Sequence, residues 1–133
     1  MRARTHFVLL LCLLACGGCS KKKSTDQLIE DLKSPQDKDR LIAVRLLPQR
    51  KEEAAKVVPA LIEALKDKEG DIRLSAAIGL GSFGEQAKDA IPALQAVQRD
   101  RDARIREAAG KALSRIDPVK FPVPSKPRPA PGK

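Results

Sequence analysis

The sequence GDIRLSAAIGLGSFG, at residues 70–84, decides the fold because its pattern recurs along the chain. The same residue types fill its main positions 33 residues earlier and 33 residues later. The matching sets are Leu28, Leu61 and Leu94; Arg40, Arg73 and Arg106; Ala43, Ala76 and Ala109; and Leu47, Leu80 and Leu113. A short unit of this kind cannot bury its own apolar face, so its copies must stack on one another. The repeat therefore predicts an all-α fold, a short α-solenoid of about three helix pairs, which would offer surfaces to partners rather than enclose a pocket.

Composition supports helices and argues against nucleic-acid binding. The 133 residues include no Trp, no Tyr and three Phe, so the core must be aliphatic. The net charge is +9, but residues 27–117 hold 17 Lys and Arg against 16 Asp and Glu, a net charge of +1. A fold that follows a phosphate backbone needs a local excess of positive charge, and base stacking needs aromatic side chains. We therefore expect no nucleic acid among the partners.

The first 15 residues have the features of a signal peptide. Arg2 and Arg4 precede the apolar run FVLLLCLLA at residues 7–15, which is too short to cross a bilayer as a helix. The sequence LLAC, ending at Cys16, resembles a bacterial lipobox. This resemblance implies cleavage before Cys16 and acylation of its thiol, with Cys19 as the fallback acceptor. A secreted protein without lipid and an uncleaved N-terminal anchor are the alternatives.

A lipidated Cys16 would place the chain at the cell envelope, on the extracytoplasmic side of a membrane. Residues 16–25 would then form the lipidated N-terminus and a basic linker, in which Lys21, Lys22 and Lys23 lie near the bilayer. These lysines either attract anionic headgroups or form a solvated spacer. Gly17 stands where an Asp favours inner-membrane retention in similar lipoproteins, so the outer membrane is preferred if the cell has two membranes.

The apolar spacing predicts two helices in each repeat. The first helices are expected at residues 26–33, 57–66 and 91–99. The second helices are expected to start near residues 35, 68 and 101, after the N-cap candidates Ser34, Asp67 and Asp100, and to end near residues 47, 83 and 116. Ser24 and Gln27 resemble a capping box, and Gly84 is a natural helix stop.

Residues 26–117 resemble HEAT repeats of the phycobilisome (PBS) lyase type, a bacterial family. The resemblance rests on residues 70–84 and 90–94, and on Ile105, Arg106, Ala109 and Leu113. The first repeat departs from the pattern at Asp39 and Pro48, which suits a terminal unit. Some relatives are bilin lyases, so an enzyme that handles a chromophore is one alternative function. Residues 16–133 contain no His, Tyr or Trp to line a tetrapyrrole site, and we expect a non-catalytic protein with no cofactor and no metal.

A helical wheel centred on Ala76 predicts the binding face. The face would be concave, with an apolar ridge of Leu41, Leu74 and Ile78 bordered by charged residues. These border residues are Arg45, Glu107 and Lys111. A contiguous exposed apolar patch indicates a partner site, while the alternative is that these side chains fill gaps between repeats.

Two further patterns complete the prediction. Arg40, Arg73 and Arg106 are expected to form an inter-repeat ion-pair ladder with nearby acids such as Asp71, Glu69, Asp100 and Asp102.

Residues 118–133 contain six prolines and should be extended or disordered, either contacting anionic envelope polymers or remaining inert. The expected function is protein–protein interaction at the cell envelope with an unknown protein, and an accessory subunit of an envelope complex is a further alternative.

Overall fold

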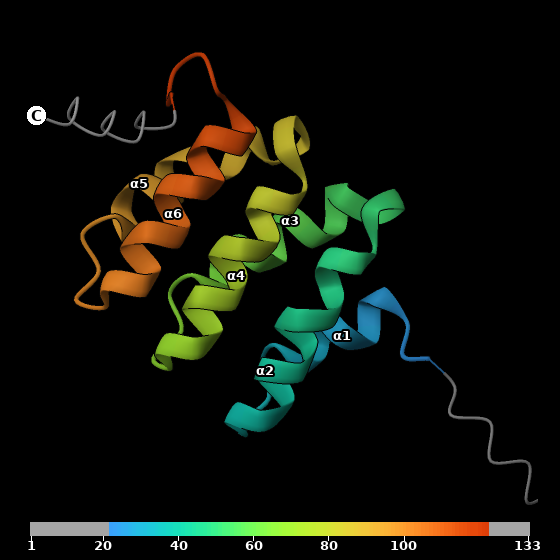
Figure 1. The fold of residues 1–133 in the computed structure, drawn as a ribbon. Coiled ribbons are helices and arrows are strands. Elements are labelled where there is room, and N and C mark those ends of the chain that lie inside the picture. The colour runs from blue at the N-terminus through green and yellow to red at the C-terminus, as the bar shows by residue number, and fades with distance from the viewer. Residues whose placement is uncertain (1–21, 123–133) are drawn as a thin grey trace, which may run out of the picture.

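The repeated apolar spacing produces three pairs of helices, shown in Figure 1. A computed structural model describes residues 22–122. The first helices of the pairs are α1 (Thr25–Asp31), α3 (Ala54–Ala64) and α5 (Ile91–Val97); the second helices are α2 (Asp37–Leu46), α4 (Gly70–Ser82) and α6 (Ala103–Ile116). Short 3-10 turns, η1 (Leu47–Gln49), η2 (Lys51–Glu53) and η3 (Gly84–Ala90), connect the pairs. The described part of the chain contains no strand, which confirms the prediction of an all-α stack of three helix pairs.

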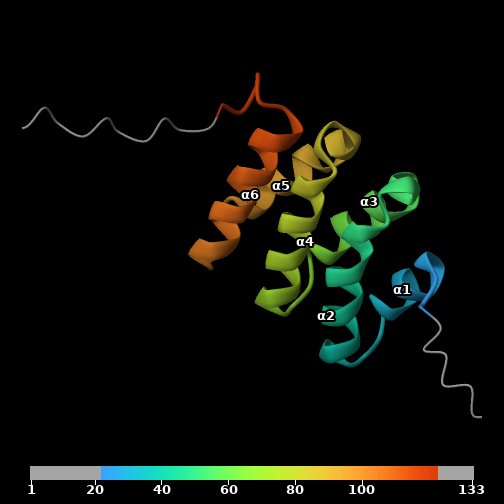
Figure 2. The same ribbon diagram turned by 45° about the vertical axis from the view of Figure 1, so that its right-hand side comes forward.

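The helices form two layers, which Figures 1 and 2 show from two sides. α2, α4 and α6 lie side by side in one layer, and α1, α3 and α5 lie in the other. The central helix α4 packs against α2, α3 and α6. The repeated leucines fill the space between the layers and are fully buried: Leu28, Leu61, Leu94, Leu47, Leu80 and Leu113. Burial of each such side chain contributes about 2 kcal/mol, so the residues that define the repeat also hold the stack together.

Two glycines of α4 let the neighbouring repeats approach closely. A Cβ atom at Gly79 would lie 2.7 Å from Cγ of Pro48, and one at Gly81 would lie 3.0 Å from Cα of Ala112. Any larger side chain at these positions would push α4 away from the first or the third repeat.

The repeated arginines join each repeat to the next. Arg40 donates from Nε and Nη2 to the Asp67 carboxylate at 2.8 and 3.2 Å, and Arg73 does the same to Asp100 at the same two distances. Each arginine also donates from Nη1 to two backbone carbonyls of the loop before its own helix. The side chains in both ion pairs are largely buried. The expected ion-pair ladder is therefore present at Arg40 and Arg73, and its acids are Asp67 and Asp100. The expected roles of Glu69, Asp71 and Asp102 in it are wrong, and Arg106 forms no ion pair within residues 22–122.

These contacts set the protonation of the two aspartates. Hydrogen bonds from the Arg73 side chain and from the backbone N–H of Asp102 hold the pKa of Asp100 below its ordinary value. Burial acts in the opposite direction at Asp67, but hydrogen bonds from Arg40 and from the backbone N–H of Glu69 outweigh it, and the pKa of Asp67 is also lowered. Both carboxylates are thus charged at neutral pH.

The start of each second helix differs from the prediction. The N-caps are Gln36, Glu69 and Asp102, two residues after the expected Ser34, Asp67 and Asp100. The expected caps instead accept the backbone N–H two residues later, at 3.2, 2.9 and 2.9 Å, and so close a turn before the helix. The predicted capping box of Ser24 and Gln27 is present, and α4 ends next to Gly84, whose φ is +55°.

The segment after α6 also differs from the prediction of an extended tail. Residues 118–122 fold back in a turn, in which the N–H of Phe121 donates to the Asp117 carbonyl at 2.9 Å. The Phe121 ring is half-buried and packs against the core. An aromatic side chain can bury area here that the surrounding prolines cannot. The rest of the tail, residues 123–133, lies outside the described residues, as do the predicted signal peptide, Cys16 and Cys19. None of the helices within residues 22–122 has the length and apolar character that a bilayer crossing requires.

Candidate partner-binding face

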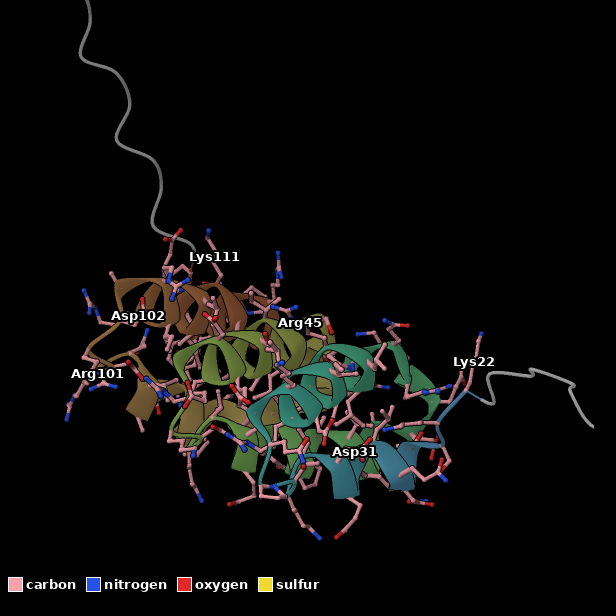
Figure 3. The ribbon with its side chains drawn as sticks, turned by 90° about the horizontal axis from the view of Figure 1, so that it is seen from below. Lys22, Asp31, Arg45, Arg101, Asp102 and Lys111 are labelled. Carbon is pink, nitrogen blue, oxygen red and sulfur yellow. The ribbon has the colours of Figure 1, made fainter. Side chains whose placement is uncertain are left out.

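The outer surface of α2, α4 and α6 is called the B face below. It carries two open grooves, one on each side of α4. Of the six residues predicted to bind a partner, five line these grooves: Arg45, Leu74, Ile78, Glu107 and Lys111. Figure 3 shows Arg45 and Lys111 on the B face, while Asp31 of α1 lies on the opposite layer.

The groove between α4 and α6 has a volume of about 270 Å³. Its lining includes small residues of both helices, which leave the space open: Ala77, Gly81, Ala108 and Ala112. Leu74 and Ile78 line it from α4, and Glu107 and Lys111 line it from α6. The two helices approach closely at this groove, since a Cβ atom at Gly81 would lie 3.0 Å from Cα of Ala112.

The groove between α2 and α4 has a volume of about 420 Å³. Ser75, Gly79 and Ser82 contribute its small surface on α4, and Arg45 and Pro48 line it on the side of the first repeat. Leu74 and Ile78 also belong to this groove, so α4 carries a ridge that both grooves share.

The ridge is narrower than the sequence predicted. Ile78 is 53 % exposed and forms its crest, whereas Leu74 is half-buried and packs against the core. Leu41 lines neither groove; like Leu74 it is half-buried and packs against the core, so it does not extend the ridge that the two grooves share. A helical wheel gives only the direction of a side chain from its own axis, and neighbouring helices decide whether that direction is filled.

The charges beside the grooves are partly paired. Lys111 Nζ donates to Glu107 at 2.6 Å, and this hydrogen bond holds the pKa of Glu107 below its ordinary value. Arg104 joins α6 to α4 through Asp71 at 3.4 Å. Arg45 in one groove and Arg115 in the other have no carboxylate within ion-pair distance among residues 22–122. Each groove therefore combines apolar surface with one arginine that is free to bind a carboxylate.

A family model for HEAT repeats matches residues 25–114, which is most of the chain and all three helix pairs. The chain belongs to the HEAT-repeat family. Comparison with curated protein sequences found no match.

Among solved structures, this HEAT-repeat chain resembles one titled "The structure of the complex of CpcE and CpcF of phycocyanin lyase from Nostoc sp. PCC7120". The TM-score is 0.65 and the sequence identity is 26 %. The match covers 75 % of this chain and 40 % of the other, so the chain spans less than half the length of that protein.

Two exposed apolar residues of the HEAT domain were not predicted from the sequence: Ile42 and Leu46 of α2, which are 53 % and 38 % exposed. The repeat itself held the signal for them. The positions equivalent to Ile42 are Ser75 and Ala108, and those equivalent to Leu46 are Gly79 and Ala112. These positions are small in the second and third repeats because the second helix of the preceding repeat packs there.

Metal-binding residue types are scattered over the described HEAT repeats. Within residues 22–122, His, Cys, Asp and Glu do not gather in a group of three or more that could hold a metal ion. The acids Asp100 and Asp102 are instead hydrogen-bonded to Arg73 and Arg104.

Proposed function

We propose that this HEAT-repeat protein is a non-catalytic lipoprotein of the bacterial cell envelope that presents its B face to a protein partner. The main support is the ridge at Ile78, an exposed isoleucine between two grooves on the central helix. Ser75 and Gly79 on one side of it, and Ala108 and Ala112 on the other, leave room for side chains of a partner.

The grooves indicate the chemistry of that partner. They lie on both sides of α4, and packed helices are about 10 Å apart. Two apolar side chains spaced by seven residues on a helix are separated by a similar distance, about 10.5 Å. Carboxylates next to them could pair with Arg45 and Arg115. The partner would therefore present an amphipathic helix with acidic borders, bound across the ridge of Ile78.

The proposed anchor rests on sequence features. A basic start, a nine-residue apolar run and the lipobox-like LLAC precede Cys16. Acyl chains on Cys16 would hold the HEAT domain at the membrane surface, since several chains together bind stably where a single one does not. The absence of an aspartate at position 17 favours the outer membrane in a cell with two membranes.

The interaction is tested with two isoleucines of equal exposure. Ile78→Glu changes the ridge, and Ile42→Glu changes the end of the stack, where the side chain is also 53 % exposed. After crosslinking in native membranes and mass spectrometry, Ile78→Glu should lose the recovered partner, and Ile42→Glu should retain it. Equal recovery from both variants would exclude the B face. Recovery of one stoichiometric partner would favour the accessory subunit of a complex over a scaffold with several partners.

Leu74 is unsuitable for the same test. Its side chain is half-buried against the core, so Leu74→Glu would destabilise the fold and also change the groove. The ridge is therefore changed only at Ile78.

A chromophore lyase is the second candidate, favoured by the resemblance to the phycocyanin lyase complex. A purified protein that absorbs visible light, or loss of chromophore attachment in a deletion strain, would support it. A colourless protein and a deletion strain with intact pigments would leave the interaction function in place.

A further inference from the structure

The first repeat ends the stack with an apolar surface that the second and third repeats do not have. Ile42 and Leu46 are one helical turn apart on the side of α2 that faces away from α4. In α4 and α6 the equivalent side faces the preceding repeat and carries only Ser, Gly or Ala. We call the surface formed by Ile42, Leu46, Lys22, Lys23 and Lys38 the N-terminal edge.

Positive charge gathers at the Leu46 end of this apolar pair. A depression of about 190 Å³ is lined by Leu46, the buried Leu28 and Gln49, together with Lys22, Lys23 and Arg50. Lys23 is paired with Asp31 at 2.7 Å, and Arg50 Nη2 donates to the backbone carbonyl of Lys23 at 2.8 Å. Lys22, and Lys38 one turn before Ile42, have no carboxylate within ion-pair distance among residues 22–122. Two acids, Asp37 and Asp39, flank Lys38 in the first turn of α2. Asp39 accepts from the Ser34 hydroxyl at 3.0 Å, so the excess of cations lies at the other end of the helix, beside Leu46.

A second copy of the chain fits this edge poorly. Continued stacking needs small residues, because a Cβ atom at Gly79 would already lie within 2.7 Å of the first repeat. Ile42 and Leu46 would hold another helix away. Pairing of two N-terminal edges would bring their lysines together, and two side chains supply little of the roughly 1,600 Å² that stable interfaces bury.

A lipid surface requires no complementary shape. It supplies an apolar interior for isoleucine and leucine side chains and phosphates for lysines. We propose that the N-terminal edge docks on anionic phospholipid headgroups, with Ile42 and Leu46 entering the interface and Lys22, Lys23 and Lys38 contacting phosphates. This inference rests on the proposed acylation of Cys16. Five residues separate Cys16 from Lys22, so Lys22 lies within about 20 Å of the anchor. Docking would fix the orientation of the stack, and the B face, which is a different surface, would stay accessible to a partner with or without it.

The absence of tryptophan and tyrosine from the chain allows a direct test. Ile42→Trp and Ile78→Trp each introduce a single fluorophore at sites of equal exposure. The acylated chains are reconstituted into vesicles of brominated phosphatidylcholine with or without phosphatidylglycerol. We expect blue-shifted, quenched emission at position 42 in the anionic vesicles, weaker quenching in neutral vesicles or high salt, and little quenching at position 78. Equal quenching at both positions, or none at position 42, would overturn the inference.

The anchor and the docking are separated by a second measurement. Mass spectrometry of the same samples reports whether Cys16 is acylated. The full chain without lipid is then added to vesicles of phosphatidylglycerol, where Lys22→Ala should lower the partition coefficient about fivefold, as loss of one interfacial charge predicts. Vesicle binding by a chain that is not acylated would support the docking and exclude the anchor. An acylated chain without quenching at position 42 would support the anchor and exclude the docking. A blue shift at position 42 that needs protein concentration but no lipid would assign the edge to a second copy and overturn the inference.

Discussion

The two ends of the stack are finished in different ways. At the N-terminal edge, Ile42 and Leu46 stay exposed where the second and third repeats have small residues. At the C-terminal end, the chain turns back after α6 and Phe121 covers part of the surface beside Gly110 and Ser114. The repeat pattern alone would assign both ends the same structure. The difference shows that whether a repeat position is buried or exposed depends on which segment packs beside it.

The ladder ends asymmetrically as well. Ser34 replaces the aspartate of the inner loops, so the first repeat has no ladder carboxylate at this position. Arg106 keeps its Nη1 hydrogen bonds to the carbonyls of Asp100 and Arg101, at 2.9 and 3.1 Å. Within residues 22–122, these carbonyls are its only hydrogen-bond acceptors. The same residue type thus holds two repeats together at Arg73 and only one loop at Arg106.

The largest expected effect separates an inner from a terminal ladder arginine. Arg73→Met leaves the mostly buried Asp100 carboxylate without its partner and should lower the free energy of unfolding by about 3 kcal/mol. Arg106→Met removes only hydrogen bonds to exposed carbonyls and should cost less than about 1 kcal/mol. Urea denaturation followed by circular dichroism measures both values, and similar losses would mean that the ladder does not depend on its ion pairs.

The next largest effect is expected on the stability of the fold at low pH. The pKa values of Asp67 and Asp100 are lower in the folded chain than in the unfolded chain. Both ion pairs therefore contribute fully above the unfolded value near pH 4, and their contribution is lost as the pH falls below it. Melting temperatures between pH 5 and pH 2.5 should fall more steeply for the natural chain than for Arg73→Met with Asp100→Leu, which lacks one pair. Parallel curves would assign the acid sensitivity to other carboxylates.

Closure of the C-terminal end should have a moderate effect. Phe121→Ala removes a half-buried ring and should lower the free energy of unfolding by about 1.5 kcal/mol, roughly half the value for a fully buried phenylalanine. Val119→Ala in the same turn is the control, because Val119 is 93 % exposed and should have almost no effect. Chemical denaturation compares the two, and an unchanged midpoint for Phe121→Ala would show that the turn adds nothing to the fold.

Two helix glycines compare the interface between α4 and α6 with the C-terminal end of the stack. Gly110→Ala should stabilise the chain by up to about 1 kcal/mol, since alanine favours helix and the nearest atom to a new Cβ is the Gln98 side chain at 3.8 Å. Gly81→Ala gains the same propensity but places a Cβ 3.0 Å from Ala112, so we expect no net gain or a loss of about 1 kcal/mol. Equal stabilisation by both substitutions would show that α4 and α6 separate easily.

The smallest effect is expected at the N-terminal edge. Ile42→Ser restores the residue type of the inner repeat on a side chain that is already half exposed, so the free energy of unfolding should change by less than about 0.5 kcal/mol. A large loss in differential scanning calorimetry would mean that Ile42 is covered in solution.

The sequence predicted what depends on the period and missed what depends on neighbours. The buried leucines and the arginine ladder follow from residues that recur every 33 positions. The predicted starts of the second helices were wrong because Asp67 and Asp100 do not cap them. Each aspartate binds an arginine of the preceding repeat and closes a turn before the helix. The statistical preference of aspartate for N-cap positions includes neither of these contacts. Phe121 was assigned to the tail because the surrounding prolines dominate the composition, although a single ring can still pack on α6.

The candidate site shows the same limit. The helical wheel placed Arg45, Ile78, Glu107 and Lys111 on one surface, and the structure brings them to the two grooves. The helical wheel could not show that Leu41 packs against the core or that Ile42 stays exposed, because both depend on where the adjacent helices lie.

The arginine ladder makes the molecule extensible by gene duplication. Each inner unit offers an aspartate to the unit before it and an arginine to the unit after it, as residues 67–99 do with Asp67 and Arg73. An inserted duplicate of these 33 residues would find both partners already in place, with glycines positioned for close approach. Longer descendants would thereby gain a groove with every added unit, without any compensating substitution elsewhere.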